Sequence, residues 1–255
     1  MANNAVQRRA TSDSATREHL ILAAEKLIAE DGVYGASMRR ISAEAGQKNV
    51  SAIHYYFGSR EAMIEAVFAY RMAQNGPRRQ KMNDELDTCG RTHELGAFVR
   101  NAILPLSETL LSSAQENHYV RFLAQVQRVT HFDYWMQVPH QHRKPLVQNY
   151  VQVMRLLSHL PRPIMHMRCV SQLKQVFYAL ADLDLVISER HPGLRDELVH
   201  FHTADLIDRT SAALQAPVSE QVKATYESLL KLAPRPQETV FGLDIVRERS
   251  AFIRS

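Results

Sequence analysis

The sequence predicts an all-α protein, and composition, apolar spacing and a lack of strand signals support this. Its 255 residues include only 9 glycines and 10 prolines, and the hydrophobic fraction of 45% can supply a buried core. Apolar residues recur at helical spacing, and alternating β-branched runs are few. We therefore expect an N-terminal three-helix unit, joined by a fourth helix to a larger helical bundle.

Charge and cysteine content narrow the class of protein. The formal charge is +4 and the isoelectric point about 9.1, a basic excess that permits nucleic-acid binding without proving it. Cys89 and Cys169 are too few for a disulfide framework, so we expect a cytoplasmic protein. The N-terminus lacks a signal-peptide apolar region, and no apolar run approaches the roughly 18–20 residues that cross a bilayer. We expect no membrane partner.

The chain opens on a polar segment, residues 1–15, which we expect to be a flexible arm. Arg8 and Arg9 could reach DNA phosphates, although an unstructured basic tail is the simpler interpretation. Thr16 can cap a first helix, which Gly32 should end. The apolar stripe of that helix consists of Leu20, Ala24, Leu27 and Ile28.

Two short helices, 37–45 and 50–57, are predicted around a glycine-containing turn. Gly46 suits the left-handed residue that ends a helix, and either Asn49 or Ser51 could cap the second one. In the second helix, an apolar face leaves small, polar and aromatic side chains on the other side. This arrangement is typical of a DNA-reading helix-turn-helix.

A fourth helix should begin after Ser59, which can serve as its N-cap, with Glu61 in its first turn. We expect it to extend to about Gln74, where the sequence Asn-Gly-Pro at 75–77 should break it.

The segments TREHLILAAEKLIAEDG, SMRRISAEAG and SAIHYYFGSREAMIEAVF carry a family resemblance, above all through the aromatic junction YYFGSRE. Together, these segments, from Thr16 to Phe68, resemble the DNA-binding domain of the TetR family of transcriptional regulators. The turn at 47–49 looks one residue longer than in most members. The resemblance implies a homodimer that binds double-stranded operator DNA and a small-molecule effector.

Outward-facing residues of the second short helix are the main candidates for DNA contact. Ala52 can touch a thymine methyl group, His54 can bond a base edge, and Tyr55 can reach a phosphate. Lys48 lies by the helix N-terminus, where a phosphate is favoured, and the resemblance implies a backbone contact by Arg60. The full candidate set is Arg17, Ser37, Lys48, Asn49, Ser51, Ala52, His54, Tyr55 and Arg60.

The domain division follows from these elements: an arm at 1–15, a helix-turn-helix domain at 16–60, a helical effector-binding and dimerisation domain at 61–216, and a C-terminal extension at 217–255. Helices are predicted at 93–113, 117–130, 144–159, 163–190 and 193–215, with Pro105 kinking the first, and a further amphipathic helix begins near Val218.

Aromatic and methionine residues of the central helices usually form core, and some could line an effector pocket. The pocket candidates are Phe98, Phe122, Trp135, Tyr150, Met154, Phe177 and Tyr178. The last predicted helix carries apolar residues on two faces, and the second face favours a dimer partner over purely internal packing. The interface candidates are Leu194, Leu198, Phe201 and Ile207.

Histidines suggest one rival function, an all-helical enzyme with a site at His131, His140 and His142. Surface or pocket-lining histidines are the simpler interpretation, because neighbours two apart on a helix point in different directions. We find no nucleophile with an evident base, and we predict no cofactor, no metal and no enzymatic activity.

The expected function is a ligand-responsive transcriptional repressor, released from a pseudo-palindromic operator by a small apolar or aromatic effector. An activator or a ligand-independent regulator of the same fold is the nearest alternative.

Overall fold

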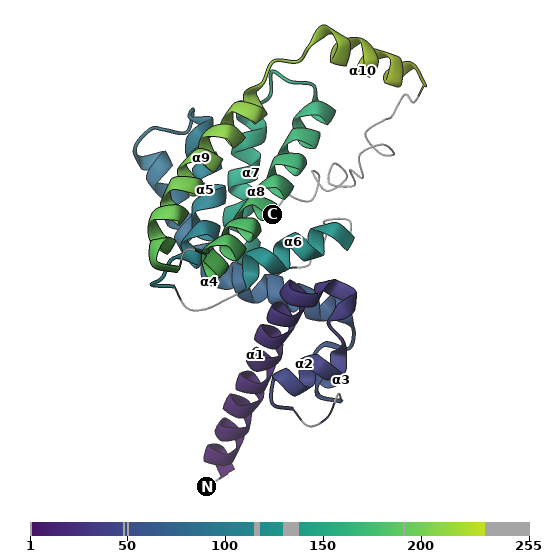
Figure 1. Ribbon diagram of the computed structural model, residues 1–255, viewed down its shortest axis with the longest axis vertical. Helices are drawn as coiled ribbons and strands as arrows, with labels where there is room; N and C mark the ends of the chain where they lie inside the picture. Colours follow the sequence, from purple (N-terminus) through teal and green to yellow (C-terminus); the bar gives the residue numbers. More distant parts are fainter. Residues whose placement is uncertain are drawn as a thin grey trace.

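The computed structural model describes residues 2–47, 49, 51–114, 118–129, 138–190 and 192–232. Within these residues every regular element is a helix, which confirms the all-α prediction (Figure 1). The elements are α1 Ala2–Gly35, α2 Met38–Glu44, α3 Ser51–Phe57, α4 Arg60–Thr88, α5 Leu95–Ser107, η1 Glu108–Leu110, α6 Tyr119–Val129, α7 His140–Leu156, α8 Arg162–Arg190, η3 Pro192–Leu194, α9 Arg195–Gln215 and α10 Glu220–Leu232.

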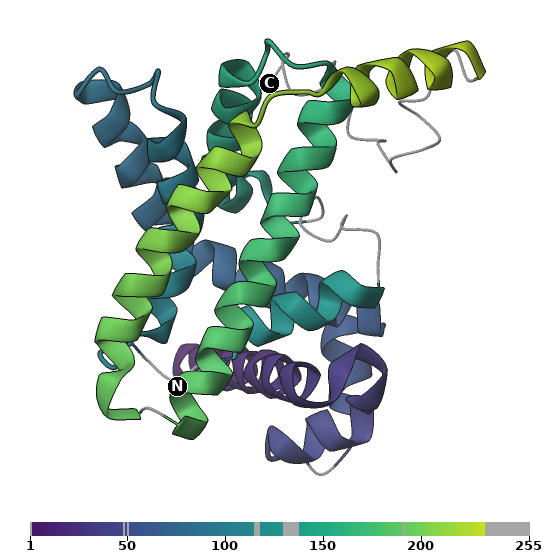
Figure 2. The same cartoon turned by 45° about the horizontal axis from the view of Figure 1, so that its top comes forward.

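The helices form a small N-terminal unit beneath a larger bundle. Helices α1, α2 and α3 lie at one end, and α4, α5, α7, α8 and α9 form the bundle at the other (Figure 1). Helix α6 lies between them and packs on both α1 and α8. Figure 2 shows α8 and α9 side by side along one face, with α10 projecting beyond the bundle.

Helix α1 is interrupted at the predicted stop, although it resumes as far as Gly35, and it begins earlier than predicted. Gly32 has φ +78°, a left-handed conformation that interrupts the helix at the expected stop. At the other end, the helix starts at Ala2, whereas the sequence predicts a flexible arm over residues 1–15. That segment contains no proline or glycine and is rich in alanine, so nothing in it prevents the helix from extending.

The two short helices have the predicted caps. The Ser37 hydroxyl accepts a hydrogen bond from the Arg40 N–H, and Gly46 adopts φ +70° after α2. Of the two candidates for capping α3, Asn49 serves: its Oδ1 accepts from the Ser51 N–H at 3.0 Å.

Helix α4 does not break at 75–77, so this prediction is wrong. It begins after Ser59, whose hydroxyl accepts from the Ala62 N–H, and it continues through Pro77 to Thr88. Pro77 removes one backbone hydrogen bond, but buried residues on both sides, including Met72 and Met82, hold the helix in the core. A β-carbon on Gly76 would lie 3.6 Å from the His142 carbonyl, so the glycine permits close packing of α7.

Pro105 lies inside α5, which continues to Ser107 and then tightens into the 3₁₀ turn η1. Because proline has no N–H, the Asn101 carbonyl lacks its usual helical partner. The Arg79 Nε donates to this carbonyl instead, at 3.4 Å. Asn101 also donates to Asn83, which in turn donates to the Pro145 carbonyl, so polar contacts join α5, α4 and α7.

One hydrophobic core extends from the N-terminal unit into the bundle. Leu20 and Ile53 belong to it in the small unit, and Phe68, Phe122 and Ile187 continue it upward. Helix α10 is the helix predicted for the extension, but it lies mostly in solvent, and the residues after 232 are outside the described part.

Candidate nucleic-acid interface and ligand cavity

Helix α3 presents the predicted residues on its solvent side. Ile53 is fully buried and anchors the helix, whereas Ser51, His54 and Tyr55 are exposed and Ala52 is half-buried. The Tyr55 ring is 77% exposed although it is large and partly apolar. An exposed aromatic side chain on this face is available for contact with a phosphate or a base.

A shallow hollow beside α3 brings several candidates together. Asn49, Ser51, Ala52 and Tyr55 line it, and the opposite wall belongs to the N-terminal part of α1. The Tyr56 hydroxyl donates to the Asp13 Oδ1 at 3.2 Å across this hollow. The wall that α1 supplies extends the surface that a nucleic acid could contact.

Two of the basic side chains in the N-terminal unit are paired with carboxylates of the same unit. Lys26 lies 2.5 Å from Glu44, and Arg40 lies 2.6 Å from Asp31. The hydrogen bond from Lys26 lowers the pKa of the Glu44 carboxyl. Arg17 is exposed with its guanidinium 5.4 Å from the centre of the Phe57 ring, which places it beside the end of α3.

Arg60 has an internal partner that the sequence did not reveal. Its guanidinium donates to the Val33 carbonyl and, at 2.7 Å, to the Ala36 carbonyl, so it ties α4 to the turn between α1 and α2. Ser37 and Asn49 are exposed, and each caps a helix. Lys48 lies outside the described residues.

Tyr34 is a surface residue that the sequence analysis missed. It is 77% exposed and lies in the last turn of α1, between Gly32 and Gly35. The available signal was a large aromatic residue in a glycine-flanked turn, where little core can cover it.

Replacing Arg60 with alanine should destabilise the small unit rather than act on DNA contact alone. Two carbonyls lose a charged donor, which costs about 1–3 kcal/mol. We expect thermal denaturation to show a lower melting temperature than for Arg39→Ala, an exposed arginine of α2. Equal melting of the two variants would contradict a structural role for Arg60.

A cavity of about 180 Å³ lies in the bundle among α4, α5, α7 and α8. Of the predicted pocket residues, Phe98, Tyr150 and Phe177 line it. Phe122 is in the core below it, Met154 contacts the lining residue Cys169, and Tyr178 is on the outer side of α8. Trp135 lies outside the described residues.

The cavity wall includes a tyrosine, a histidine, a cysteine and two arginines whose contacts and ionisation bear on ligand binding. The Tyr150 hydroxyl lies 2.9 Å from the His166 Nδ1, and burial lowers the pKa of His166, which favours the neutral ring. Burial raises the pKa of the Cys169 thiol to about 12, so it remains protonated at neutral pH. Arg71 and Arg79 also line the cavity.

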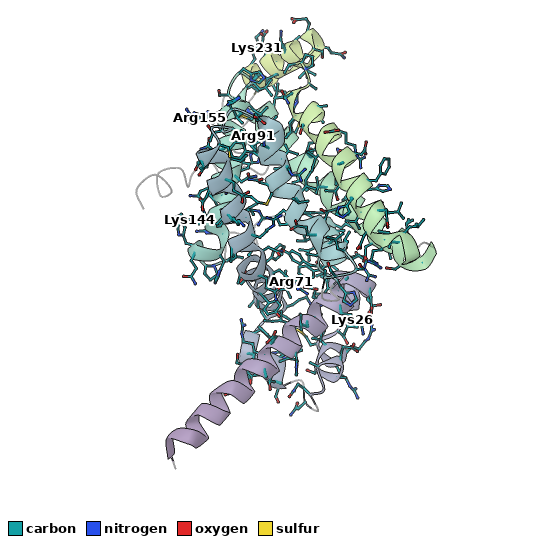
Figure 3. All side chains as sticks on the ribbon, turned by 90° about the vertical axis from the view of Figure 1, so that its left-hand side faces the viewer. Lys26, Arg71, Arg91, Lys144, Arg155 and Lys231 are labelled. Atoms are coloured by element: carbon teal, nitrogen blue, oxygen red, sulfur yellow. The ribbon has the colours of Figure 1, made fainter. Side chains whose placement is uncertain are left out.

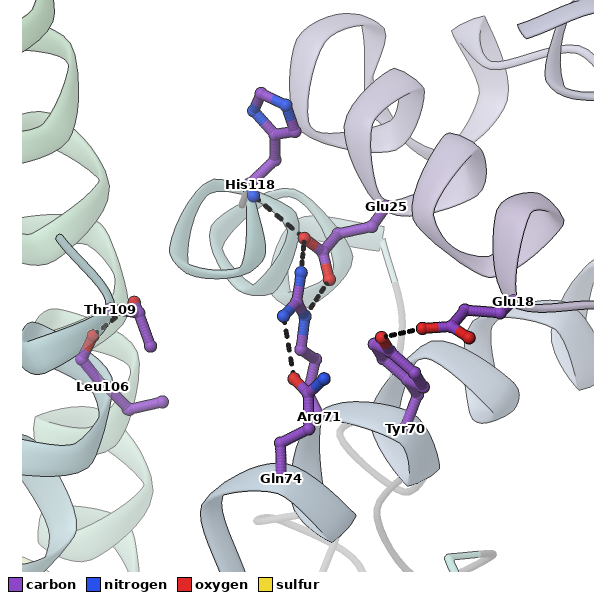
Figure 4. A network of polar contacts seen from close by, with 8 residues as sticks. All are labelled: Glu18, Glu25, Tyr70, Arg71, Gln74, Leu106, Thr109 and His118. Atoms are coloured by element: carbon purple, nitrogen blue, oxygen red, sulfur yellow. Dashed lines mark hydrogen bonds and ion pairs between the residues drawn. The ribbon is translucent and has the colours of Figure 1, made fainter. Parts of the chain in front are cut away.

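Arg71 links the cavity to α1 (Figure 4). Its Nε and Nη2 donate to the two Glu25 oxygens at 2.6 and 2.7 Å, and both side chains are almost fully buried. Glu25 also accepts from the His118 backbone N–H, at the start of α6. Figure 3 shows Arg71 where α1 meets the bundle, so one ion pair joins α1, α4 and α6.

Several large apolar side chains are exposed along α8, η3 and α9, among exposed polar residues. Phe201 is 70% exposed, Leu194 is exposed and Leu198 is half-buried, as expected for residues that face a partner. Ile207 differs: it is 9% exposed and packs inside the protomer, because its side of α9 faces the bundle. Leu185 and Val186 of α8 are also exposed and were missed.

Neither a metal site nor a membrane-spanning helix is found among the described residues. His140 and His142 lie in the first turn of α7, and His131 is outside the described part. No group of three or more His, Cys, Asp or Glu side chains there could hold a metal ion. Among these same residues, no helix is long and apolar enough to span a bilayer.

The arrangement of α1, α2 and α3 defines a helix-turn-helix domain, placed below a bundle that contains its own cavity. Residues 20–67 match the family described as bacterial regulatory proteins, tetR family. This N-terminal segment therefore matches the DNA-binding domain of that family of regulatory proteins.

Comparisons with whole proteins gave structural likenesses only. No curated protein sequence matches. The chain is similar to the transcriptional regulator FadR from Bacillus subtilis, solved with stearoyl-CoA: identity is 15%, coverage 77% of this chain and 98% of that one, and the TM-score 0.39. It is also similar to a putative TetR-family regulator from Mesorhizobium loti, at 14% identity, 80% and 95% coverage, and a TM-score of 0.35.

Proposed function

We propose that the protein is a cytoplasmic, homodimeric repressor that a small apolar effector releases from its operator. The observation that carries this proposal is the position of Arg71, which lines the cavity and forms the buried ion pair with Glu25 of α1. A molecule in the cavity would touch a side chain that holds the DNA-binding unit in place.

Helix α4 supplies the mechanical connection. Only two residues separate it from the end of α3, and the same helix contributes Phe68, Met72 and Asn75 to the cavity wall. A ligand that displaces this wall would also move the start of α4 and with it α3. Coupling between two sites typically amounts to about 1–3 kcal/mol, or a 5- to 150-fold change in DNA affinity.

The exposed apolar side chains of α8, η3 and α9 support the homodimer. Phe201 and Leu194 would bury apolar area against the same residues of a second copy, as a two-fold interface requires. The two α3 helices would then enter successive major grooves about 34–36 Å apart. Ser51, His54 and Tyr55 would face the bases and phosphates.

Selection of bound fragments from random duplex DNA tests the proposal. We expect a two-fold symmetric site whose half-sites are separated by about 10 base pairs, or one helical turn. Recovery of no enriched sequence, or of sites without symmetry, would contradict it. A reporter placed behind the selected site gives the sign of regulation, and a repressor should lower its expression.

A further inference from the structure

Arg79 carries a buried charge that lacks an acidic partner. The residue is 5% exposed and lines the cavity. Among the described residues it forms no ion pair, and its one hydrogen bond is the 3.4 Å contact from Nε to the Asn101 carbonyl. Arg71, by contrast, is matched by both oxygens of Glu25.

The surrounding wall does not compensate this charge. The lining residues of the described cavity include no aspartate or glutamate, and most are aliphatic or aromatic. Histidine does not add a second charge, because burial lowers the pKa of His166. A buried charge without a partner is costly, and such a group in a cavity wall marks a binding site. The cavity therefore carries one unmatched positive charge.

Asn149, another polar residue of the cavity wall, lies near Arg79. It is 3% exposed, and its Oδ1 has no hydrogen-bond partner, although its Nδ2 donates to the Phe98 carbonyl at 3.0 Å. Phe98 and Asn101 are three residues apart on α5, so the carbonyls that hold Asn149 and Arg79 are about 5 Å apart along the helix. The two polar groups thus lie at the same part of the cavity.

We propose that this cavity selects a small apolar monoanion, a carboxylate on one aromatic ring or a medium-length aliphatic chain, whose carboxylate pairs with Arg79. This inference rests on the proposed effector role of the cavity. A guanidinium and a carboxylate match in a two-bond geometry.

Size and charge restrict the ligand further. An apolar cavity of about 150 Å³ can hold benzene, so the 180 Å³ here accommodates one ring or a comparable chain. A phosphate ester with two charges would leave one charge unmatched, since Arg71 is already paired with Glu25. A ligand with a single negative charge would balance the positive charge of Arg79.

Calorimetric titration of the full-length protein tests the inference with matched probes. We would compare 4-ethylbenzoate with 4-ethylbenzamide and octanoate with octanamide, so that each pair differs in charge but little in shape. We expect the better-fitting acid to bind about 10- to 100-fold more tightly than its amide, as a charge-assisted contact implies. Arg79→Gln should remove this preference, and Arg100→Gln, on the exposed side of α5, should retain it.

A melting measurement separates the binding role from a structural one. Arg79→Met should melt at a higher temperature than the unliganded wild type, because a buried unmatched charge is replaced by an apolar chain. If Arg79 serves mainly as the partner of the Asn101 carbonyl, Arg79→Met should instead melt at a lower temperature than the wild type. That result would count against the inference.

The outcomes distinguish the two proposals. Equal affinity of the acid and the amide for the wild type overturns the anion preference, even if the variants fail to fold, but leaves the cavity as an effector site. If neither probe of either pair binds, the inference is also overturned. Release of operator DNA by a neutral ligand would support the proposed function without this preference.

Discussion

Replacing Tyr55 with alanine is expected to weaken operator binding by about 10- to 100-fold while leaving the fold intact. The side chain is 77% exposed and lies outside the core, and its one ring contact is with the neighbouring Tyr56, so its removal should act mainly on contacts with DNA. A lost contact costs about 1–3 kcal/mol, and a dimer presents two copies of α3. Gel retardation measures the affinity, and size-exclusion chromatography checks that the oligomeric state is unchanged.

Tyr34→Ala is the matched control for this prediction. Tyr34 has the same exposed fraction, 77%, and belongs to the same domain, but it lies in the last turn of α1 and not on α3. We expect a much smaller loss of affinity. An equal loss for both variants, or no loss for Tyr55→Ala, would remove α3 from the role of reading helix.

Removing one member of the Arg71–Glu25 pair should have the largest effect on stability. Arg71→Met leaves the Glu25 carboxylate buried without its cation, and breaking a buried pair costs about 3–5 kcal/mol. Chemical denaturation should show this loss directly. Arg78→Met removes an arginine about two turns further along α4. Its pair with Glu108 is at the surface, so the loss should cost less than about 1 kcal/mol.

The double variant Arg71→Met with Glu25→Gln separates stability from signalling. Glutamine can still accept the His118 N–H but carries no charge, so we expect the double variant to be more stable than Arg71→Met alone. If the pair transmits the effector signal, the double variant should bind operator and remain bound when effector is added. Normal release by effector would show that another contact carries the signal.

The helix caps and the glycines that interrupt or follow helices could be predicted from the sequence, because the groups that determine them are only a few residues away. Ser37 and Ser59 cap helices through N–H groups three residues on, and Gly32 and Gly46 adopt the backbone conformations that their positions indicated. The prediction for 75–77 failed because residues on both sides of Pro77, including Met72 and Met82, are buried against distant segments, and this packing outweighs the local preference to stop.

The candidate site was predictable in part for the same reason. Exposed residues of α3 follow from helical phase alone, and Ser51, His54 and Tyr55 are on the solvent side. Arg60 could not be assigned, since its carbonyl partners are more than twenty residues earlier in the chain. In the bundle, Phe122 and Tyr178 share a residue type with Phe98 and Tyr150, and only the packing of the helices decides which of them face the cavity.

The uninterrupted α4 affects how the two parts of the molecule can come apart. No linker separates them: the helix that follows α3 continues into the bundle, and the apolar core continues with it. The N-terminal unit therefore resists excision by a protease at 75–77 and loses part of its own interior if cut there. Unfolding of either part would expose the interior of the other, so we expect the described helices of the two parts to melt together.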